Sequence, residues 1–175
     1  MYMRPQKRAP TMTMSNDTTT TDAKSVDDLD GSAAHPGMVA YVETLSRTEC
    51  LNLLALAPIG RVGVVVDGEP VILPVNFALD GDSVLFRTTD TSVLNQASMN
   101  KVAFEVDHVD SETRGGWSVL IRGRADDIAD AIDATSVRLR RLELFTWAPG
   151  ARHHWYVIRP HAITGRRVRV IPAEL

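Results

Sequence analysis

Short runs of β-branched and apolar residues, separated by turn residues, dominate the chain from residue 61 onward. The first run is RVGVVV (61–66), and Asp67-Gly68 follows it as a typical two-residue hairpin turn before a return run. The same succession of run and turn continues toward the C-terminal end. It predicts six or seven mostly antiparallel strands, over residues 61–66, 70–79, 83–89, 101–109, 116–128, 153–160 and 162–171.

Three segments show helical patterning instead. Residues 46–49, Ser-Arg-Thr-Glu, have capping-box spacing, apolar residues then recur at helical intervals, and Pro58 ends the pattern. We expect a short helix around residues 92–99 and an amphipathic helix over residues 129–145, with Asp127 as a candidate N-cap. Strands and crossover helices do not alternate regularly. The pattern therefore favours a small closed or half-closed β-barrel with a few helices over a doubly wound parallel sheet.

Residues 1–37 differ from the rest of the chain. Threonine, serine, aspartate, proline and glycine dominate them, and apolar periodicity is absent. Such a segment buries too little surface to offset its ordering entropy, so we expect a disordered tail before one folded domain over residues 38–175. We expect no secretory signal, because no continuous apolar stretch follows the early basic residues. A translation start at a later methionine, such as Met38, stays an open alternative.

Composition narrows the classes of partner. The 175 residues include 19 basic and 22 acidic side chains, which give a formal net charge of −3. A nucleic-acid-binding protein usually carries a basic excess, so we expect no nucleic-acid partner. The single cysteine excludes an intramolecular disulfide and a zinc site built on several thiolates. No apolar run approaches the ~20 residues that span a bilayer, and we expect a cytoplasmic protein without a membrane partner.

The sequence shows no convincing catalytic constellation. The motifs GxSxG, GxGxxG and HExxH and the P-loop are all absent. His153 and His154 are adjacent, so on a strand they point to opposite faces and cannot share one metal ion. Glu105 and Asp107 lie on one face of a predicted strand, where a solvated charged surface is favoured over an acid–base pair. We therefore expect no metal site and assign no catalytic side chain.

Residues 87–92, Arg-Thr-Thr-Asp-Thr-Ser, join a predicted strand to a predicted helix. Hydroxyl groups donate hydrogen bonds, Arg87 adds charge-assisted ones, and a helix N-terminus presents unpaired N–H groups. The segment is therefore a candidate phosphate-binding loop. A hydroxyl-rich helix cap without a ligand is the alternative. Farther along, two glycines precede Trp117, which predicts either a close approach of the backbone to a flat group or a tryptophan in the core or an interface.

Taken in order, these segments resemble the pyridoxamine 5′-phosphate oxidase-like proteins with an FMN-binding split β-barrel, and most closely the small actinobacterial-type members. The resemblance covers residues 40–171 and depends on the order and spacing of four motifs: Pro74-Val75-Asn76, Arg87-Thr88-Thr89, Gly116-Trp117-Ser118-Val119 and Ile163-Thr164-Gly165-Arg166. It implies a mainly β fold with a few helices, namely a six- to seven-stranded antiparallel split β-barrel of Greek-key-like topology. It also implies a homodimer with two FMN sites at the interface.

The resemblance further implies which residues bind the cofactor. The phosphate and ribityl chain would meet the end of the third strand, and the flavin ring would lie beside the strand that carries Pro74. Residues from the long strand and the last strand would lie near the ring or the pocket. The implied set is Arg61, Pro74, Val75, Asn76, Arg87, Thr88, Thr89, Ser92, Trp117, Ser118 and Arg166.

The chain departs from the family pattern at Ser92-Val93, where many relatives carry a lysine or an Arg-Lys pair that binds the phosphate. Loss of one charge-assisted hydrogen bond weakens affinity by roughly 1.5–3 kcal/mol, or about one to two decades. The expected function is that of an FMN-dependent oxidoreductase acting on a small molecule that the sequence does not identify. The alternative is a non-catalytic carrier or sensor, or a protein that binds deazaflavin or haem on the same barrel.

Overall fold

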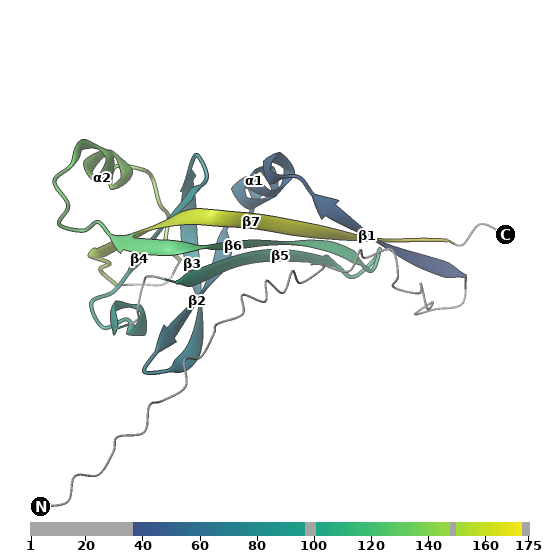
Figure 1. Cartoon of the computed structure of the whole chain (residues 1–175), viewed down its shortest axis with the longest axis horizontal. Coiled ribbons are helices and arrows are strands. Elements are labelled where there is room, and N and C mark those ends of the chain that lie inside the picture. Colours follow the sequence, from purple (N-terminus) through teal and green to yellow (C-terminus); the bar gives the residue numbers. More distant parts are fainter. Residues whose placement is uncertain (1–36, 97–100, 148–149, 173–175) are drawn as a thin grey trace, which may run out of the picture. The chain divides into compact units, whose positions relative to one another are not determined.

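The computed structural model describes residues 37–96, 101–147 and 150–172, so the tail predicted over residues 1–37 lies outside the described residues except for Gly37. Strands dominate the described part, and short helices lie between them (Figure 1). The elements in chain order are β1 (Met38–Leu45), α1 (Arg47–Leu56), β2 (Ile59–Val66), β3 (Glu69–Asp80), β4 (Ser83–Thr88), the 3₁₀ helix η2 (Val93–Gln96), β5 (Val102–Asp110), β6 (Gly115–Asp127), α2 (Ala134–Leu139) and β7 (His154–Pro172).

The strands form one antiparallel sheet in the order β1-β7-β4-β3-β2-β5-β6, and β7 also pairs with β6. This second pairing closes β2 to β7 into a barrel, with β1 added along the C-terminal part of β7. Two junctions are narrow, because β2 pairs with β5 only over 61–63 and β3 pairs with β4 only over 77–80. The expectation of a mainly β, split antiparallel barrel is confirmed.

Every second side chain along the strands points into the barrel and packs in its core. In β2, Val62 and Val64 are buried while Arg61 and Val65 are exposed, as expected when successive side chains point to opposite faces. Phe104 from β5 is wholly buried and packs edge-on against Phe77, with ring centroids 4.9 Å apart. A second, smaller cluster lies under α2 and contains Leu85, Ile128, Leu139 and Val157.

Local sequence signals account for the first helix and the first hairpin. Ser46 Oγ accepts a hydrogen bond from Glu49 N at 3.3 Å, and Ser46 N donates to Glu49 Oε2 at 2.8 Å. This reciprocal pair is the capping box that the spacing predicts, and α1 ends before Pro58. Asp67 and Gly68 both have positive φ, 50° and 86°, as a type I′ turn requires. The predicted hairpin between β2 and β3 is therefore confirmed.

Two predictions about elements are wrong in extent, and one about a helix cap is wrong in position. The strands expected over 153–160 and 162–171 are one strand, because Pro160 lies beside a bulge at Arg122/Gly123 of β6, where a missing N–H is tolerated. β1 was not predicted. The helix expected over 129–145 is limited to α2, and the Arg140 guanidinium donates to the backbone carbonyl of Ala131, which ties the non-helical segment before α2 to the end of the helix. The N-cap of α2 is Asp133, not Asp127.

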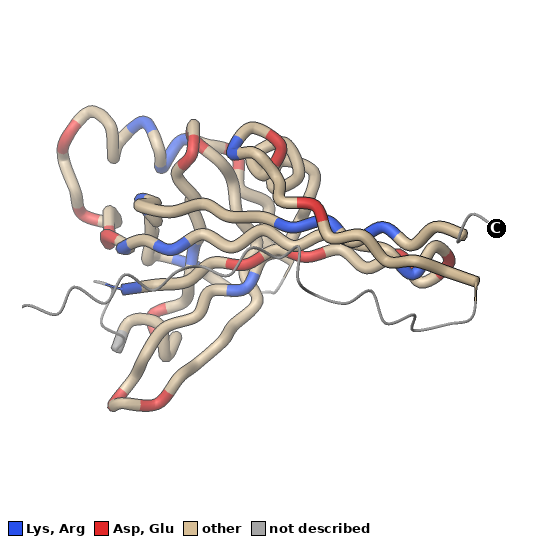
Figure 2. The backbone as a smooth tube through the Cα atoms, turned by 45° about the vertical axis from the view of Figure 1, so that its right-hand side comes forward, with Lys and Arg blue, Asp and Glu red and all other residues tan. Residues whose placement is uncertain are grey.

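Charged side chains lie along neighbouring strands and form ion pairs between them. Figure 2 shows acidic and basic residues interspersed along the backbone. Glu43 on β1 contacts Arg167 and Arg169 on β7 at 3.4 and 3.3 Å. Such exposed pairs stabilise the fold by about 0–1 kcal/mol each.

Within the described residues, no helix is both long enough and apolar enough to cross a membrane.

Candidate functional site

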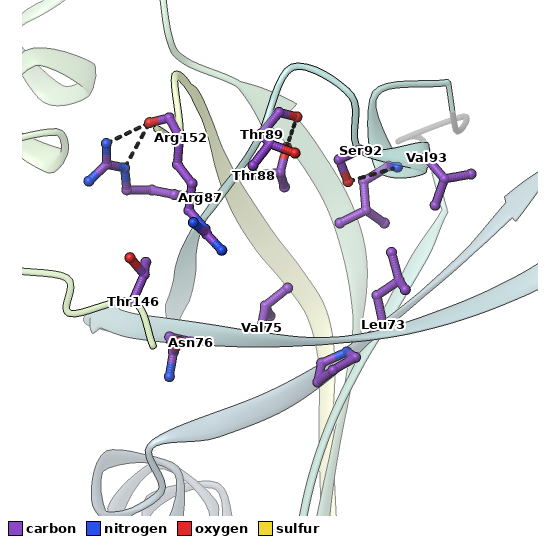
Figure 3. A pocket seen from close by; sticks show the side chains of 12 residues that line it. Leu73, Val75, Asn76, Arg87, Thr88, Thr89, Ser92, Val93, Thr146 and Arg152 are labelled. Carbon is purple, nitrogen blue, oxygen red and sulfur yellow. Dashed lines mark hydrogen bonds between the residues drawn. The ribbon is translucent and has the colours of Figure 1, made fainter. Parts of the chain in front are cut away.

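A pocket of about 440 Å³ opens between β3, the end of β4 and the segment before β7 (Figure 3). One wall is apolar, and the other presents hydroxyl groups and two arginines. Seven of the residues predicted to bind a cofactor line it. The lining residues are Leu73, Pro74, Val75, Asn76, Arg87, Thr88, Thr89, Ser92, Val93, Leu94, Thr146 and Arg152.

Asn95 holds the loop that follows β4. Its Oδ1 accepts hydrogen bonds from Thr88 Oγ1 at 3.1 Å and from the Tyr156 hydroxyl at 3.2 Å. Its Nδ2 donates to the carbonyl oxygens of Thr89 at 3.1 Å and Asp90 at 3.0 Å. Burial raises the pKa of Tyr156, which keeps its hydroxyl protonated and able to donate. The shape of the loop therefore depends on a residue that the sequence analysis did not single out.

The loop offers side-chain hydroxyls rather than a helix end. The helix expected around 92–99 is described only as the four-residue 3₁₀ helix η2, and residues 97–100 lie outside the described part. Ser92 Oγ already accepts a hydrogen bond from Leu94 N at 3.3 Å, which makes it a cap as well as a pocket residue. Thr89 Oγ1 lies 3.4 Å from Thr91 Oγ1. Over its described residues, η2 is a single short turn, so the hydroxyl groups are the part of the predicted phosphate loop that the structure describes.

Two arginines meet at the pocket in different ways. Arg87 directs its guanidinium away from the pocket, donating from Nε at 3.2 Å and from Nη2 at 2.5 Å to the carbonyl oxygen of Arg152. Its Cζ also lies 4.4 Å from the ring centroid of Trp155. The Arg152 side chain points into the pocket, and its Nη1 donates to the carbonyl oxygen of Gly150 at 3.1 Å (Figure 3). Arg152 carried no signal in the sequence beyond being one cation among many.

Asn76 positions one wall rather than offering a free amide. Its Nδ2 donates to the carbonyl oxygen of Pro58 at 3.0 Å, and its Oδ1 accepts from Trp147 N at 2.9 Å. These bonds fix the backbone next to Thr146, which lines the pocket close to Asn76 (Figure 3). Val75 and Leu73 supply the apolar surface from β3 itself.

Three other predicted residues lie away from this pocket, on β6 and β7. Ser118 pairs with Arg166 across the two strands, and both line a separate hollow of about 460 Å³. Trp117 pairs instead with Arg167, so its side chain points to the opposite face of the sheet from Ser118. One chain therefore does not bring Ser118 or Arg166 to the pocket beside β4.

The close approach expected near Trp117 is found at Gly116, where the neighbouring strand is the group that comes close. A Cβ at Gly116 would lie 2.4 Å from the carbonyl oxygen of His108. The close passage of β5 and β6 by itself requires a glycine here. Trp117 lies beside His108, with ring centroids 6.2 Å apart.

Arg61 is occupied by two carboxylates on the neighbouring strand. Its Nη1 lies 3.1 Å from Glu105 Oε2 and also contacts Asp107 Oδ1. Burial, and then the charge of Asp107, raises the pKa of Glu105. Glu105 and Asp107 are thus structural partners of Arg61 on the outside of the barrel, and Arg61 does not line the pocket beside β4. Among the described residues, no group of three His, Cys, Asp or Glu side chains is arranged to hold a metal ion.

Comparison with known proteins identifies the family. The profile described as pyridoxamine 5′-phosphate oxidase matches residues 46–167. The chain belongs to the pyridoxamine 5′-phosphate oxidase family. This finding confirms the family expected from the sequence. The match extends from the N-cap of α1 into β7 and includes every residue that lines the pocket.

Several known proteins resemble the chain over most of its length. An uncharacterized protein of Mycobacterium tuberculosis is 33% identical over 141 residues, which are 77% of this chain and 91% of the relative. The solved structure of an FAD-binding protein from Mycobacterium smegmatis is 37% identical, covers 73% of this chain and 98% of its own, and has a TM-score of 0.56. That of a putative pyridoxamine 5′-phosphate oxidase from Corynebacterium glutamicum is 29% identical, covers 76% and 100%, and has a TM-score of 0.61.

Proposed function

We propose that the chain is an FMN-dependent oxidoreductase that binds the cofactor in the pocket beside β3 and β4. The observation that carries this proposal is the convergence of side-chain hydroxyls and the Arg152 guanidinium opposite an apolar wall within one pocket. The flavin, when bound, supplies the hydride-transfer chemistry, so no strong acid or base is required of the protein. Similarity to an FAD-binding protein supports a flavin nucleotide as the ligand.

The residues present fit the two halves of such a cofactor. Thr89 and Ser92 offer hydroxyls and Arg152 offers a guanidinium to an anionic phosphate. Leu73 and Val75 offer the apolar surface on which a flat ring packs. A volume of about 440 Å³ lies within the range of roughly 300–1,000 Å³ that is usual for small-molecule pockets. The protein would orient the cofactor and exclude water, while the substrate is an unidentified small molecule.

The pocket favours a flavin over haem, which is one of the alternative ligands. Haem iron needs an axial ligand such as histidine, cysteine, methionine or tyrosine. None of the described residues that line this pocket has such a side chain. A deazaflavin shares the tricyclic ring and phosphate of FMN, so it stays the second candidate, and titration distinguishes the two.

We also propose a homodimer, because the outer face of the barrel is apolar. Strand register and alternation place six exposed apolar residues on this face. Large exposed apolar patches mark interaction sites. Arg166 and the acidic pair Glu105 and Asp107 lie on the same face. In a two-fold symmetric dimer, Arg166 of each copy can face the acidic pair of the other copy. The six residues are Val42, Val65, Ile72, Val109, Leu120 and Val168.

The dimer would complete the site. Ser118 and Arg166, which lie away from the pocket of their own chain, are on the face that meets the second copy.

We place the protein in the cytoplasm, where its one cysteine, Cys50, would remain the buried free thiol observed.

The test is a fluorescence titration of the full chain with FMN and, separately, with riboflavin. Riboflavin has the same ring and ribityl chain without the phosphate. We expect FMN to bind about 10–100-fold more tightly, because the phosphate adds charge-assisted hydrogen bonds. Parallel titrations with FAD and a deazaflavin rank the alternatives. Equal affinity for FMN and riboflavin, or a haem absorption band in the purified protein without flavin binding, would refute the proposal.

A further inference from the structure

The arginine that the sequence favours as a phosphate ligand is the one that the structure turns away. Arg87 follows β4 as expected, yet its Nε and Nη2 both donate to the carbonyl oxygen of Arg152. Its guanidinium also lies over the ring of Trp155, with Cζ 4.4 Å from the centroid. Figure 3 shows the Arg87 guanidinium directed toward the backbone of Arg152 and away from the pocket. A direct role for Arg87 would require it to give up a bidentate hydrogen bond and a cation–π contact.

Arg152 has the complementary arrangement. Its backbone is held by Arg87, whereas its half-buried side chain extends into the pocket between the Thr88-Thr89 turn and Thr146 (Figure 3). Its Nη1 donates to the carbonyl oxygen of Gly150 at 3.1 Å. A guanidinium carries five N–H donors in a planar fork, which is the geometry that binds a tetrahedral oxyanion.

The charge distribution around the loop supports the same assignment. Asp90 is the one acidic residue of the 87–92 loop, and a carboxylate in the pocket would repel a phosphate. Its Oδ1 lies instead 3.7 Å from Nε2 of His154, which is not a lining residue. His154 Nδ1 lies 3.0 Å from Asp127 Oδ2, which fixes the imidazole. The acidic group is thereby drawn out of the pocket and the basic group is left inside.

We infer that Arg152 is the residue that binds the phosphate monoester of the ligand, and that Arg87 is a positioning residue that acts through it. This inference rests on the proposed function, since it assigns the charge that the flavin phosphate meets. Ser92-Val93 after the loop offers no cation, and Arg152 supplies one from the segment preceding β7.

The experiment compares the ratio of FMN to riboflavin affinity among variants of the full chain. In Arg152→Gln, FMN binding weakens by about 10–100-fold and riboflavin binding is unchanged, so the ratio falls toward one. Arg152→Lys keeps a charge without the planar fork and retains part of the preference. Arg138→Gln is the matched control, because it removes an equal charge from the surface ion pair with Asp80 and leaves the ratio unchanged.

The role of Arg87 is tested by a double-mutant cycle. Arg87→Lys keeps the positive charge but cannot form the bidentate bond to the carbonyl of Arg152, so FMN binding weakens although the charge remains. In the Arg152→Gln background the same change has no further effect on FMN affinity. If Arg152→Gln keeps the FMN preference, or if both arginine changes weaken FMN binding additively, the inference is overturned. Thermal unfolding of each variant shows that it folds, and Arg152→Lys decides the question if Arg152→Gln does not.

Failure of the inference is distinguishable from failure of the proposed function. If the wild-type chain binds neither flavin, the flavin proposal fails. Inorganic phosphate and pyridoxal phosphate, tested by their effect on thermal unfolding, then report on the anion site alone. Stabilisation of the wild-type chain by these probes but not of Arg152→Gln supports the assignment of Arg152, and equal stabilisation of both chains contradicts it.

Discussion

At the residue scale, Gly116 is one of the positions where neighbouring strands pass too close for a side chain. Its position leaves no room for a side chain, because an added Cβ would lie 2.4 Å from the His108 carbonyl oxygen and 3.3 Å from Val109 Cα. Both of these atoms are backbone, so they do not move aside easily. We predict that Gly116→Ala lowers the free energy of unfolding by about 1–3 kcal/mol, measured by chemical denaturation.

Gly63 provides the matched control for this prediction. It also lies within a barrel strand, but its added Cβ would meet only Ala103 Cβ at 3.6 Å, which is an ordinary contact. We expect Gly63→Ala to unfold at the same denaturant concentration as the wild type or a higher one, because alanine restricts the unfolded chain. Equal stability of Gly116→Ala and Gly63→Ala would contradict the pairing of β5 with β6.

The residues of the site were predictable only where residues with suitable side chains are adjacent in the sequence. Thr88, Thr89 and Ser92 follow a strand directly, so a hydroxyl-rich loop was visible in the sequence. Asn95 and Arg152 could not be predicted in the same way. Asn95 acts through four hydrogen bonds that exist only in the folded loop. Arg152 comes from a segment 60 residues beyond Ser92. Side-chain direction, which separates Arg87 from Arg152, is likewise a property of tertiary structure.

At the scale of elements, α1 owes its start to the capping box of Ser46 and Glu49. Hydrogen bonds from Ser46 lower the pKa of Glu49. A carboxyl with a lowered pKa in the folded state contributes stability above its ordinary pKa, and this contribution is lost as the pH falls through the folded value. We predict that Glu49→Gln is less stable than the wild type near neutral pH and that the difference disappears in acid.

Ser46→Ala tests the other half of the same capping box. The substitution removes the acceptor for Glu49 N, and the loss of an N-cap costs about 1 kcal/mol. Thermal unfolding of the two single variants over a range of pH measures both effects. A difference between the wild type and Glu49→Gln that is independent of pH would show that the carboxylate does not take part in the cap.

Elements with strong local signals were predictable, and those set by their neighbours were not. Asp67-Gly68 and the capping box are local, so the first hairpin and α1 were found. β7 continues through Pro160, opposite a bulge in β6, and within the amphipathic pattern of 129–145 only Ala134–Leu139 are an α-helix. On the N-terminal side of α2 a tertiary contact competes with the helix, because the Arg140 guanidinium bonds to the carbonyl of Ala131.

At the scale of the whole barrel, the predicted cofactor residues separate into two half-sites. Seven line the pocket beside β3 and β4, while Ser118 and Arg166 lie on the outer face of β6 and β7. A second copy bound to the apolar outer face would join one half-site to the other. Dimer formation and flavin binding are therefore one claim in this account, and each is expected to strengthen the other.

Native mass spectrometry of the full chain in the presence of FMN tests that claim most directly, since it reports the number of chains and of ligands together. We predict a complex of two chains that holds two flavin nucleotides. A monomer, or a dimer that remains free of flavin with FMN in excess, would contradict the account.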